Sequence, residues 1–171
     1  NRKKLWYWVW RIGAVLLLVF TLYQIKIFVN VWWWVDHNPS SSAFMDQRRS
    51  IIQGKNPDAN LRHKWVEYER ISNHLKRGKI VAGGSTISQQ LAKNLFLSNA
   101  KTPWRKGEEA LITMMLERMM DKERIFEIYL NVIEWGDGVF GAEAAAKHYY
   151  GVSAANLNSA QAAKLAAMIP N

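Results

Sequence analysis

The sequence contains no cysteine, so its 171 residues cannot form a disulfide framework. It also contains no internal repeat and no low-complexity tract, and no acidic residue precedes Asp36. The whole chain carries 23 basic residues against 14 acidic ones, a formal net charge of +9. A chain of this length has room for one modest domain and an appendage. These absences exclude a disulfide-rich scaffold and leave a basic, apolar amino-terminal region as the most unusual feature.

This region is apolar from about Leu5 to Val35, and six of the nine tryptophans lie within the first 34 positions. They form two triplets that flank the apolar stretch: Trp6, Trp8, Trp10, Trp32, Trp33 and Trp34. An α-helix needs about 20 residues to cross a hydrocarbon core, and tryptophan rings prefer the level of the headgroups. A cleaved signal peptide would have a shorter apolar region followed by small residues. The pattern therefore predicts a retained, single membrane-spanning helix within residues 1–35.

The charges around this helix predict its orientation. Arg2, Lys3, Lys4 and Arg11 precede the apolar centre, whereas only Lys26 follows it before Asp36. The positive-inside rule then places the amino terminus in the cytoplasm and residues 36–171 outside the membrane. A helix buried in a soluble core is the alternative, and the paired tryptophan triplets argue against it.

Residues 36–171 have the pattern of a mainly α-helical domain. One of Ser40, Ser41 and Ser42 is expected to cap a short helix that ends at Gly54, and a second helix is expected to run to about Arg77. Apolar periodicity predicts four further helices, and no convincing run of strands occurs. The four helices are expected over about 104–119, 121–132, 141–150 and 159–169.

Basic residues are concentrated in one block of the outer domain. Residues 62–106 contain ten basic and two acidic side chains, whereas residues 107–171 have a net charge of −4. Such a block predicts an anionic partner, and anionic lipid headgroups or a lipid-linked phosphate fit the location better than nucleic acid, for which no motif is present. The alternative is a solvated basic face without a ligand.

Residues 83–94 join a glycine pair to the start of a helix. The glycines allow a close backbone approach to a ligand, and the free N–H groups of a first helical turn favour an anion. Amides suit sugar hydroxyls and an ammonium group suits a phosphate. The candidate ligands Gln90, Lys93 and Asn94 project from a different face than the apolar stripe of Ile87, Leu91 and Leu95. The alternative is an ordinary amphipathic helix, capped by the pair Thr86 and Gln89.

Two cations precede two carboxylates in residues 105–109. Glu109 follows Arg105 by four positions, so the two side chains can share a helix face and the carboxylate is then held ionised. The alternative is that the acids complement the helix dipole. A methionine cluster in the same helix is interpreted as core filler rather than a lipid groove: Met114, Met115, Met119 and Met120.

Taken together, these motifs resemble the peptidoglycan glycosyltransferase family, specifically its monofunctional, membrane-anchored transglycosylases. Gly-Gly-Ser-Thr-Ile-Ser-Gln-Gln-x-x-Lys-Asn stands at 83–94, Arg-Lys-x-x-Glu at 105–109, and Lys-x-x-Ile-x-x-x-Tyr-Leu-Asn at 122–131. The run 138–146 is similar to the family's following segment. Three ordered motifs of this length rarely arise by chance.

The resemblance implies a lysozyme-like α-helical domain that polymerises lipid II into β-1,4-linked glycan strands, with inversion and release of undecaprenyl pyrophosphate. It implies that Glu109 is the second catalytic glutamate, acting at the donor side. Lys93 and Arg105, with Lys101 or Lys106, are then candidate pyrophosphate ligands. The full set of implied substrate-binding residues is Gly83, Gly84, Ser85, Thr86, Gln89, Gln90, Lys93, Asn94, Lys101, Arg105, Lys106, Lys122 and Asn131.

The sequence itself requires no cofactor and contains no metal motif, whereas the resemblance leaves a divalent cation, Mg²⁺ or Mn²⁺, as a candidate. The implied partners are lipid II, the growing lipid-linked glycan and a phospholipid membrane, with other cell-wall synthesis proteins as further candidates. The implied location is the outer face of a bacterial cytoplasmic membrane.

One departure from the family affects the catalytic base. In the family the base is the glutamate of a Glu-Asp-x-x-Phe-x-x-His motif, some tens of residues before the Gly-Gly-Ser-Thr motif. Here Arg77 is followed directly by Gly78, no Glu-Asp pair occurs anywhere in the chain, and Glu67 and Glu69 lie in the wrong context. The domain is therefore expected to lack a segment near 77–78 and to be shortened at its carboxyl end.

Two explanations of this departure predict different masses. If the intact polypeptide carries further residues between Arg77 and Gly78, its mass is several kDa above 19.8 kDa. If the segment is deleted, the mass is 19.8 kDa and the alternative function is a non-catalytic, membrane-tethered binder of lipid-linked precursors. Intact-mass spectrometry of the purified protein separates the two explanations.

Overall fold

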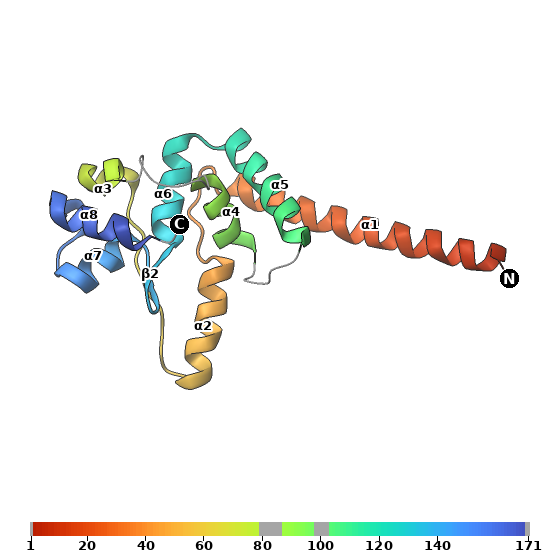
Figure 1. Ribbon diagram of the computed structural model, residues 1–171, viewed down its shortest axis with the longest axis horizontal. Helices are drawn as coiled ribbons and strands as arrows, with labels where there is room; N and C mark the ends of the chain where they lie inside the picture. The colour runs from red at the N-terminus through yellow and green to blue at the C-terminus, as the bar shows by residue number, and fades with distance from the viewer. Residues whose placement is uncertain (1, 79–86, 98–102, 170–171) are drawn as a thin grey trace. The chain divides into compact units, whose positions relative to one another are not determined.

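The computed structural model describes residues 2–78, 87–97 and 103–169 (Figure 1). The chain divides into two compact units, Asn1–His37 and Asn38–Asn171. Within the described residues there are eight α-helices, two short 3-10 helices and three short strands. The prediction of a mainly α-helical protein is confirmed.

The first unit is a single long helix, α1 (Arg2–Trp33). It contains no acidic residue, and its most apolar window has a mean hydropathy of 2.2. Apolar side chains along its length are exposed, for example Leu17 at 66%, whereas a soluble core helix would bury them. At about 1.5 Å per residue, 32 residues exceed the thickness of a hydrocarbon core. The helix fits a membrane anchor.

The second unit begins with α2 (Ala43–Lys55), and Ser42 is its N-cap. The Ser42 side chain accepts a hydrogen bond from the backbone N–H of Met45 at 3.2 Å, which satisfies one of the free donors of the first turn. The predicted end at Gly54 is wrong by one residue, because Gly54 lies inside the last turn and Asn56 caps the helix.

A small three-stranded sheet was not predicted from the sequence. Its strands are β1 (Arg62–His63), β2 (Glu134–Gly136) and β3 (Val139–Phe140), in the order β1-β3-β2. β1 pairs with β3 in parallel, and β2 and β3 form an antiparallel hairpin. Strands of two or three residues are too short for alternating hydrophobicity to reveal them.

The predicted helix that runs to about Arg77 is correct only at its end. After β1 the chain is extended, then forms the 3-10 helix η1 (Tyr68–Arg70) and the short helix α3 (Asn73–Gly78). The apolar residues that suggested a longer helix are nevertheless buried: Val66, Ile71 and Leu75. Three apolar residues alone do not show whether the segment that buries them is helical or extended.

The remaining helices agree with the predicted segments. They are α4 (Ile87–Phe96), α5 (Pro103–Met119), α6 (Lys122–Val132), α7 (Ala142–Tyr150) and α8 (Ser159–Met168), with the 3-10 helix η2 (Ala154–Asn156) before α8. Helix α6 packs against α4, α5, α7 and η1, and α3 packs against α8 (Figure 1). Ile128, Tyr129 and Leu130 of α6 have no exposed surface, so α6 is the centre of the core.

The buried Glu143 ties α7 to the following segment. Its Oε2 accepts hydrogen bonds from the Ser153 hydroxyl at 2.9 Å and the Ala154 N–H at 2.8 Å, and the ammonium groups of Lys147 and Lys64 lie 3.7 and 3.9 Å from Oε1. Burial alone would raise the pKa of Glu143, but these donors and cations outweigh it and hold the pKa below its ordinary value.

Replacing Glu143 by glutamine is expected to lower the free energy of unfolding at pH 7 by about 1–2 kcal/mol, because buried charge-assisted hydrogen bonds are weakened. A lowered folded-state pKa stabilises the protein above the unfolded pKa, and this contribution is lost as the pH falls through the folded-state pKa. The difference between wild type and E143Q is therefore expected to shrink below about pH 4. Urea unfolding in detergent, at pH 7 and below about pH 4, measures this difference in the free energy of unfolding.

The matched control is Glu117→Gln, since Glu117 is exposed and no ion pair involving it is present within the described part of the chain. E117Q is expected to leave the urea midpoint within the range of ordinary surface substitutions. An E143Q protein as stable as E117Q at pH 7 would contradict the assignment.

Candidate functional site

Helix α4 carries four of the predicted site residues: Gln89, Gln90, Lys93 and Asn94. Leu91 and Leu95 are buried as the predicted stripe requires, and Lys93 and Asn94 are half-buried. Five further predicted residues lie outside the described residues: Gly83, Gly84, Ser85, Thr86 and Lys101. The site is therefore built from α4 and the elements packed on it.

A cavity of about 430 Å³, here called the hairpin cavity, lies between α4, α2 and the β2–β3 hairpin. Gln90, Lys93 and Asn94 all line it, so the structure brings these three predicted residues together. The other lining residues come mainly from α2 and the hairpin: Phe44, Arg48, Tyr129, Ile133, Glu134, Trp135, Gly136, Asp137 and Met168. Amides, two cations and aromatic surface thus face one partly open space.

The two cations of the hairpin cavity differ in how they are paired. Arg48 Nε lies 3.0 Å from Glu134 Oε1, and its guanidinium also pairs with Asp137. In contrast, no carboxylate among the described residues lies within ion-pair distance of Lys93. The positive charge of Lys93 is therefore available to an anionic ligand, for which an ammonium group is a strong hydrogen-bond donor.

Gln90 is held in position by α6. The buried Tyr129 hydroxyl donates a hydrogen bond to Gln90 Oε1 at 2.5 Å, and Gln90 itself is only 8% exposed. Burial raises the pKa of Tyr129, so the phenol stays protonated and remains a donor. This contact fixes the face of α4 on which Lys93 and Asn94 lie.

Two lining residues were missed by the sequence analysis. Arg48 comes from α2, and Trp135 from the unpredicted strand β2. Trp135 is 2% exposed, and its buried Nε1 has no hydrogen-bond partner in the described structure. A buried N–H without a partner at a cavity wall is a donor for a ligand oxygen. No periodicity or motif signals either residue.

The start of α5 holds a buried carboxylate and two cations. Glu109 is 6% exposed, and the Lys106 ammonium lies 3.1 Å from its Oε1. The ion pair is made by Lys106, three positions earlier, rather than by Arg105. Arg105 Nε is buried and has no hydrogen-bond partner among the described residues. Because α4 packs against α5, the described part of the first motif, residues 87–94, and the motif at 105–109 come from neighbouring helices (Figure 1).

Asn131 and Lys122, both in α6, lie away from the hairpin cavity. Asn131 has no exposed surface: its Oδ1 accepts from the Val66 N–H at 2.8 Å, and its Nδ2 donates to the carbonyls of Val66 and Glu127 at 2.8 and 2.9 Å. Both amide hydrogens are thus used within the protein, which indicates a structural role. Lys122 lines a separate, larger cavity.

Sequence analysis also missed Glu127, a second buried carboxylate. It accepts hydrogen bonds from Arg124 at 2.9 Å and from Trp65 Nε1 at 3.3 Å. Burial raises the pKa of Glu127, and the neighbouring Arg124 opposes this shift. Glu127, like Arg105, Lys106 and Glu109, is not among the residues that line the two cavities, and its hydrogen bonds join residues 65–67 to α6.

A divalent-cation site is not formed by the acids of the described domain. Among residues 2–78, 87–97 and 103–169, no group of three or more histidine or acidic side chains is placed to hold a metal ion.

Comparison with known proteins gives the class of this domain. The family model described as transglycosylase matches residues 57–171, about two thirds of the chain. The chain therefore belongs to the transglycosylase family, and its helical second unit is lysozyme-like.

Similar proteins in several bacteria carry a more particular name, biosynthetic peptidoglycan transglycosylase. The protein of Methylobacillus flagellatus is 61% identical over 193 residues, covering 95% of this chain and 84% of the relative. That of Laribacter hongkongensis is 55% identical, covering 96% and 86%, and that of Herminiimonas arsenicoxydans is 53% identical, covering 99% and 85%.

These alignments are longer than the part of this chain that they contain. The first spans 193 positions, whereas 95% of 171 residues is about 162, so about 31 positions of the relative have no counterpart here. The other two give the same difference, since about 164 residues align over 195 positions and about 169 over 200. The number of unmatched positions is therefore the same, about 31, in all three alignments.

Asn131→Ala is expected to lower the free energy of unfolding by about 2–3 kcal/mol, because the buried N–H and C=O of Val66 then lose their partners. Urea unfolding in detergent measures the loss. Asn158→Ala removes an exposed helix cap instead and is expected to cost about 1 kcal/mol. A stable N131A protein that has lost only substrate binding would show that Asn131 contacts substrate.

Proposed function

We propose that this chain acts on lipid II as a peptidoglycan glycosyltransferase, forming β-1,4-linked glycan strands with inversion and releasing undecaprenyl pyrophosphate. The observation that carries the proposal is Lys93, which has no acidic partner in the part of the chain that the structure describes and which lines the hairpin cavity together with the fixed amide of Gln90. The family match and the names of the relatives support the same reaction class.

The proposed reaction needs a cationic site for its leaving group. The acceptor 4-hydroxyl attacks C1 of the donor sugar from the face opposite the pyrophosphate. The bond between C1 and the pyrophosphate oxygen breaks, its electron pair leaves with the pyrophosphate, and the hydroxyl proton passes to a base. Lys93 and Arg105 are proposed to bind the departing pyrophosphate, since Lys93 has no acidic partner among the described residues and Arg105 Nε is buried without one.

Glu109 is proposed to act at the donor side through its contact with Lys106. A carboxylate that is only 6% exposed and 3.1 Å from an ammonium group holds that cation in one position. Lys106 then adds positive charge to the start of α5, next to Arg105. The pair supplies a positioned cation for the pyrophosphate, while the carboxylate remains available to the donor sugar.

The anchor explains how such an enzyme meets its substrate. A polyprenyl chain keeps lipid II in the bilayer, so a domain tethered by α1 encounters it by diffusion in two dimensions. From the basic residues before the apolar centre we propose that the amino terminus is cytoplasmic and that residues 36–171 lie outside. We also propose that the chain crosses the membrane once, through α1.

A second candidate function rests on the missing Glu-Asp pair. Without a base, the same cationic site would bind lipid-linked precursors without polymerising them, and the chain would be a membrane-tethered binder. Both functions use Lys93 and Arg105 in the same way. They differ only in whether the acceptor hydroxyl loses its proton.

Lys93→Ala is expected to weaken the interaction with the pyrophosphate by about 1.5–3 kcal/mol, which is about 10- to 150-fold. The loss is measured as the rate of polymerisation of labelled lipid II, or as the affinity for lipid II in nanodiscs where no polymer forms. Lys164→Ala removes one exposed lysine from α8 and is the charge-matched control. Equal behaviour of K93A and K164A in both assays would contradict the assignment of Lys93.

Glu109→Gln is expected to reduce polymerisation at least about tenfold, because a positioned charge at the donor is lost. Glu108→Gln, the adjacent acid on α5, is the matched control and is expected to retain the wild-type rate. In the alternative function no polymer forms with any variant, and E109Q alters only lipid II affinity. An E109Q protein with wild-type turnover would remove Glu109 from the site.

A further inference from the structure

Trp135 lies at a bulge in the β2–β3 hairpin. Glu134 pairs with Phe140 and Gly136 pairs with Val139, so two residues that are two positions apart on β2 face adjacent residues on β3. Trp135 is therefore the extra residue of β2. A β-bulge leaves its extra residue out of the ladder and changes the direction of that side chain. Here the residue lines the hairpin cavity.

Helix α7 holds this bulge in place. The Tyr149 hydroxyl donates a hydrogen bond to the Trp135 carbonyl at 3.0 Å. A Cβ at Gly136 would collide with the same hydroxyl, so a glycine is needed there for Tyr149 to reach the strand. The backbone of Trp135 is thus fixed by the protein itself, without a ligand.

The indole N–H of Trp135 has no acceptor. The residue is 2% exposed, and its Nε1 is buried without a hydrogen-bond partner among the described residues. An indole nitrogen is only a donor, and a buried donor without an acceptor costs free energy. Such groups are few in folded proteins. A donor held in this way at a cavity wall indicates a ligand that supplies the acceptor.

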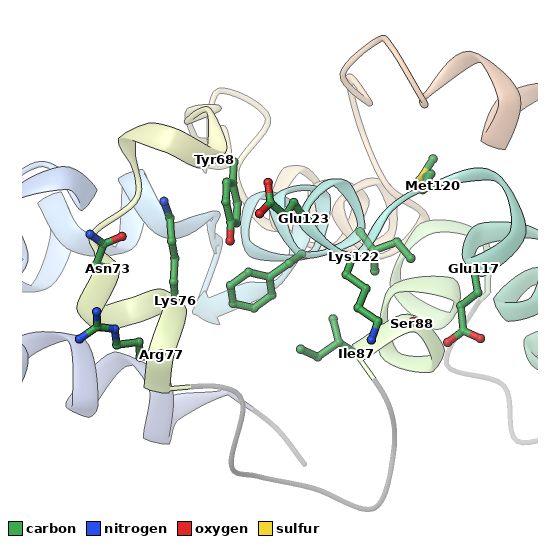
Figure 2. Close-up of a pocket in the computed structure, with 12 residues that line it drawn as sticks. Tyr68, Asn73, Lys76, Arg77, Ile87, Ser88, Glu117, Met120, Lys122 and Glu123 are labelled. Atoms are coloured by element: carbon green, nitrogen blue, oxygen red, sulfur yellow. The ribbon is translucent and has the colours of Figure 1, made fainter.

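The larger cavity, of about 900 Å³, provides a contrast (Figure 2). Cations from two helices line it, among them Lys76 and Lys122. None of its described lining residues has a buried polar atom without a partner. In the hairpin cavity, Arg48 Nε lies 3.0 Å from Glu134 Oε1, so this donor faces a carboxylate. Within the described chain, Trp135 is therefore the lining residue of these two cavities whose buried donor is unmet.

The polar groups beside Trp135 are mainly donors. Gln90 Oε1 already accepts the hydrogen bond of Tyr129, which leaves the N–H groups of this amide, and the ammonium group of Lys93 has no acceptor capacity. Asn94 can both donate and accept. A ligand that presents acceptor oxygens fits this wall.

The chemistry at Trp135 favours an amide carbonyl. A sugar hydroxyl brings a hydrogen that itself needs an acceptor when it is buried, whereas an amide carbonyl brings none. An anion is better matched by Lys93 than by a neutral N–H. The apolar residues Phe44, Ile133 and Met168 line the same cavity and suit a methyl group. A carbonyl joined to a methyl group is the acetyl part of an acetamido group.

A ligand reaches the buried Nε1 when side chains of the cavity wall shift. Met168 is 40% exposed, and Phe44 is half-buried. Methionine is unbranched and adapts its shape readily. The wall therefore contains side chains that can move aside for an acetyl group, while Tyr149 keeps the backbone of Trp135 fixed.

We propose that the Trp135 indole N–H donates a hydrogen bond to the acetamido carbonyl of an N-acetylated sugar, and that this contact selects N-acetylated over non-acetylated substrates. The proposal rests on the proposed function, because it places a sugar of lipid II beside the pyrophosphate bound by Lys93. Both sugars of lipid II carry an acetamido group. Trp135 acts in binding and takes no part in proton transfer.

The test compares the wild-type chain with Trp135→Phe, which removes the N–H and keeps an aromatic ring. Affinity is measured in nanodiscs for lipid II and for two analogues, each with the acetamido group of one sugar replaced by hydrogen. The wild type is expected to bind lipid II about 5- to 10-fold more tightly than one of the analogues, and W135F is expected to bind both equally. The analogue that shows this effect identifies the sugar.

Trp65→Phe is the matched control. It also removes an indole N–H, but Trp65 donates to Glu127 at 3.3 Å and lines neither cavity. W65F is expected to keep the wild-type ratio of affinities for lipid II and the analogues. If W135F keeps the wild-type ratio for both analogues, the proposal is overturned.

A measurement on the wild-type chain covers the case in which W135F does not fold. The indole ¹H–¹⁵N resonance of Trp135 is expected to shift when lipid II is added and to stay in place with the analogue that lacks the relevant acetamido group. A Trp135 resonance that responds equally to lipid II and to both analogues would overturn the assignment.

Failure of this inference is distinguishable from failure of the proposed function. Trp135-dependent selectivity without polymer supports the inference and contradicts glycan transfer. Binding and polymerisation of lipid II without such selectivity overturn the inference and leave the proposed function intact. A wild-type chain that does not bind lipid II overturns both.

Discussion

The burial of α6 is the constraint on which the rest of the outer domain depends. Its side chains bind two other parts of the chain, α4 and the segment at residues 65–66, through specific hydrogen bonds as well as apolar contact. Tyr129 fixes Gln90 of α4, Asn131 binds both backbone groups of Val66, and Glu127 binds Trp65. Each of these bonds is buried or partly buried, so breaking one leaves a polar group without a partner. The position of the candidate site relative to the core follows from these contacts.

Helix α4 lies between two spaces of different character. The side with Gln90, Lys93 and Asn94 borders a cavity of mixed polar and apolar walls, and among the described residues Lys93 has no acidic partner there. The end with Ile87 borders a larger cavity that Ile125 and Phe126 also line. Because α4 is held by α6 and α5, both spaces are fixed by the same packing.

The sequence predicts the long helices well, because their apolar periodicity is strong and their first turns carry capping residues. It does not predict the sheet, since strands of two or three residues contain no readable alternation. Arg48 and Trp135 reach the hairpin cavity from distant parts of the chain, and only the fold brings them there. At Asn131, a motif position that suggested a ligand, the side-chain amide makes its hydrogen bonds to backbone groups of Val66 and Glu127. Periodicity identifies the elements, whereas long-range contacts decide what each polar side chain does.

The two halves of the proposed reaction are affected unequally by the absence of a Glu-Asp pair from the sequence. The leaving-group side depends on Lys93, Arg105 and Lys106, all of which are present on helices α4 and α5. The acceptor side depends on a base, which the resemblance assigns to that pair. A cationic site without a base still lowers the free energy of a bound pyrophosphate, since charge-assisted hydrogen bonds need no proton transfer. It does not raise the nucleophilicity of a sugar hydroxyl, which requires a positioned acceptor for its proton. On the proposed function, therefore, donor binding and glycan transfer are separable steps that depend on different residues.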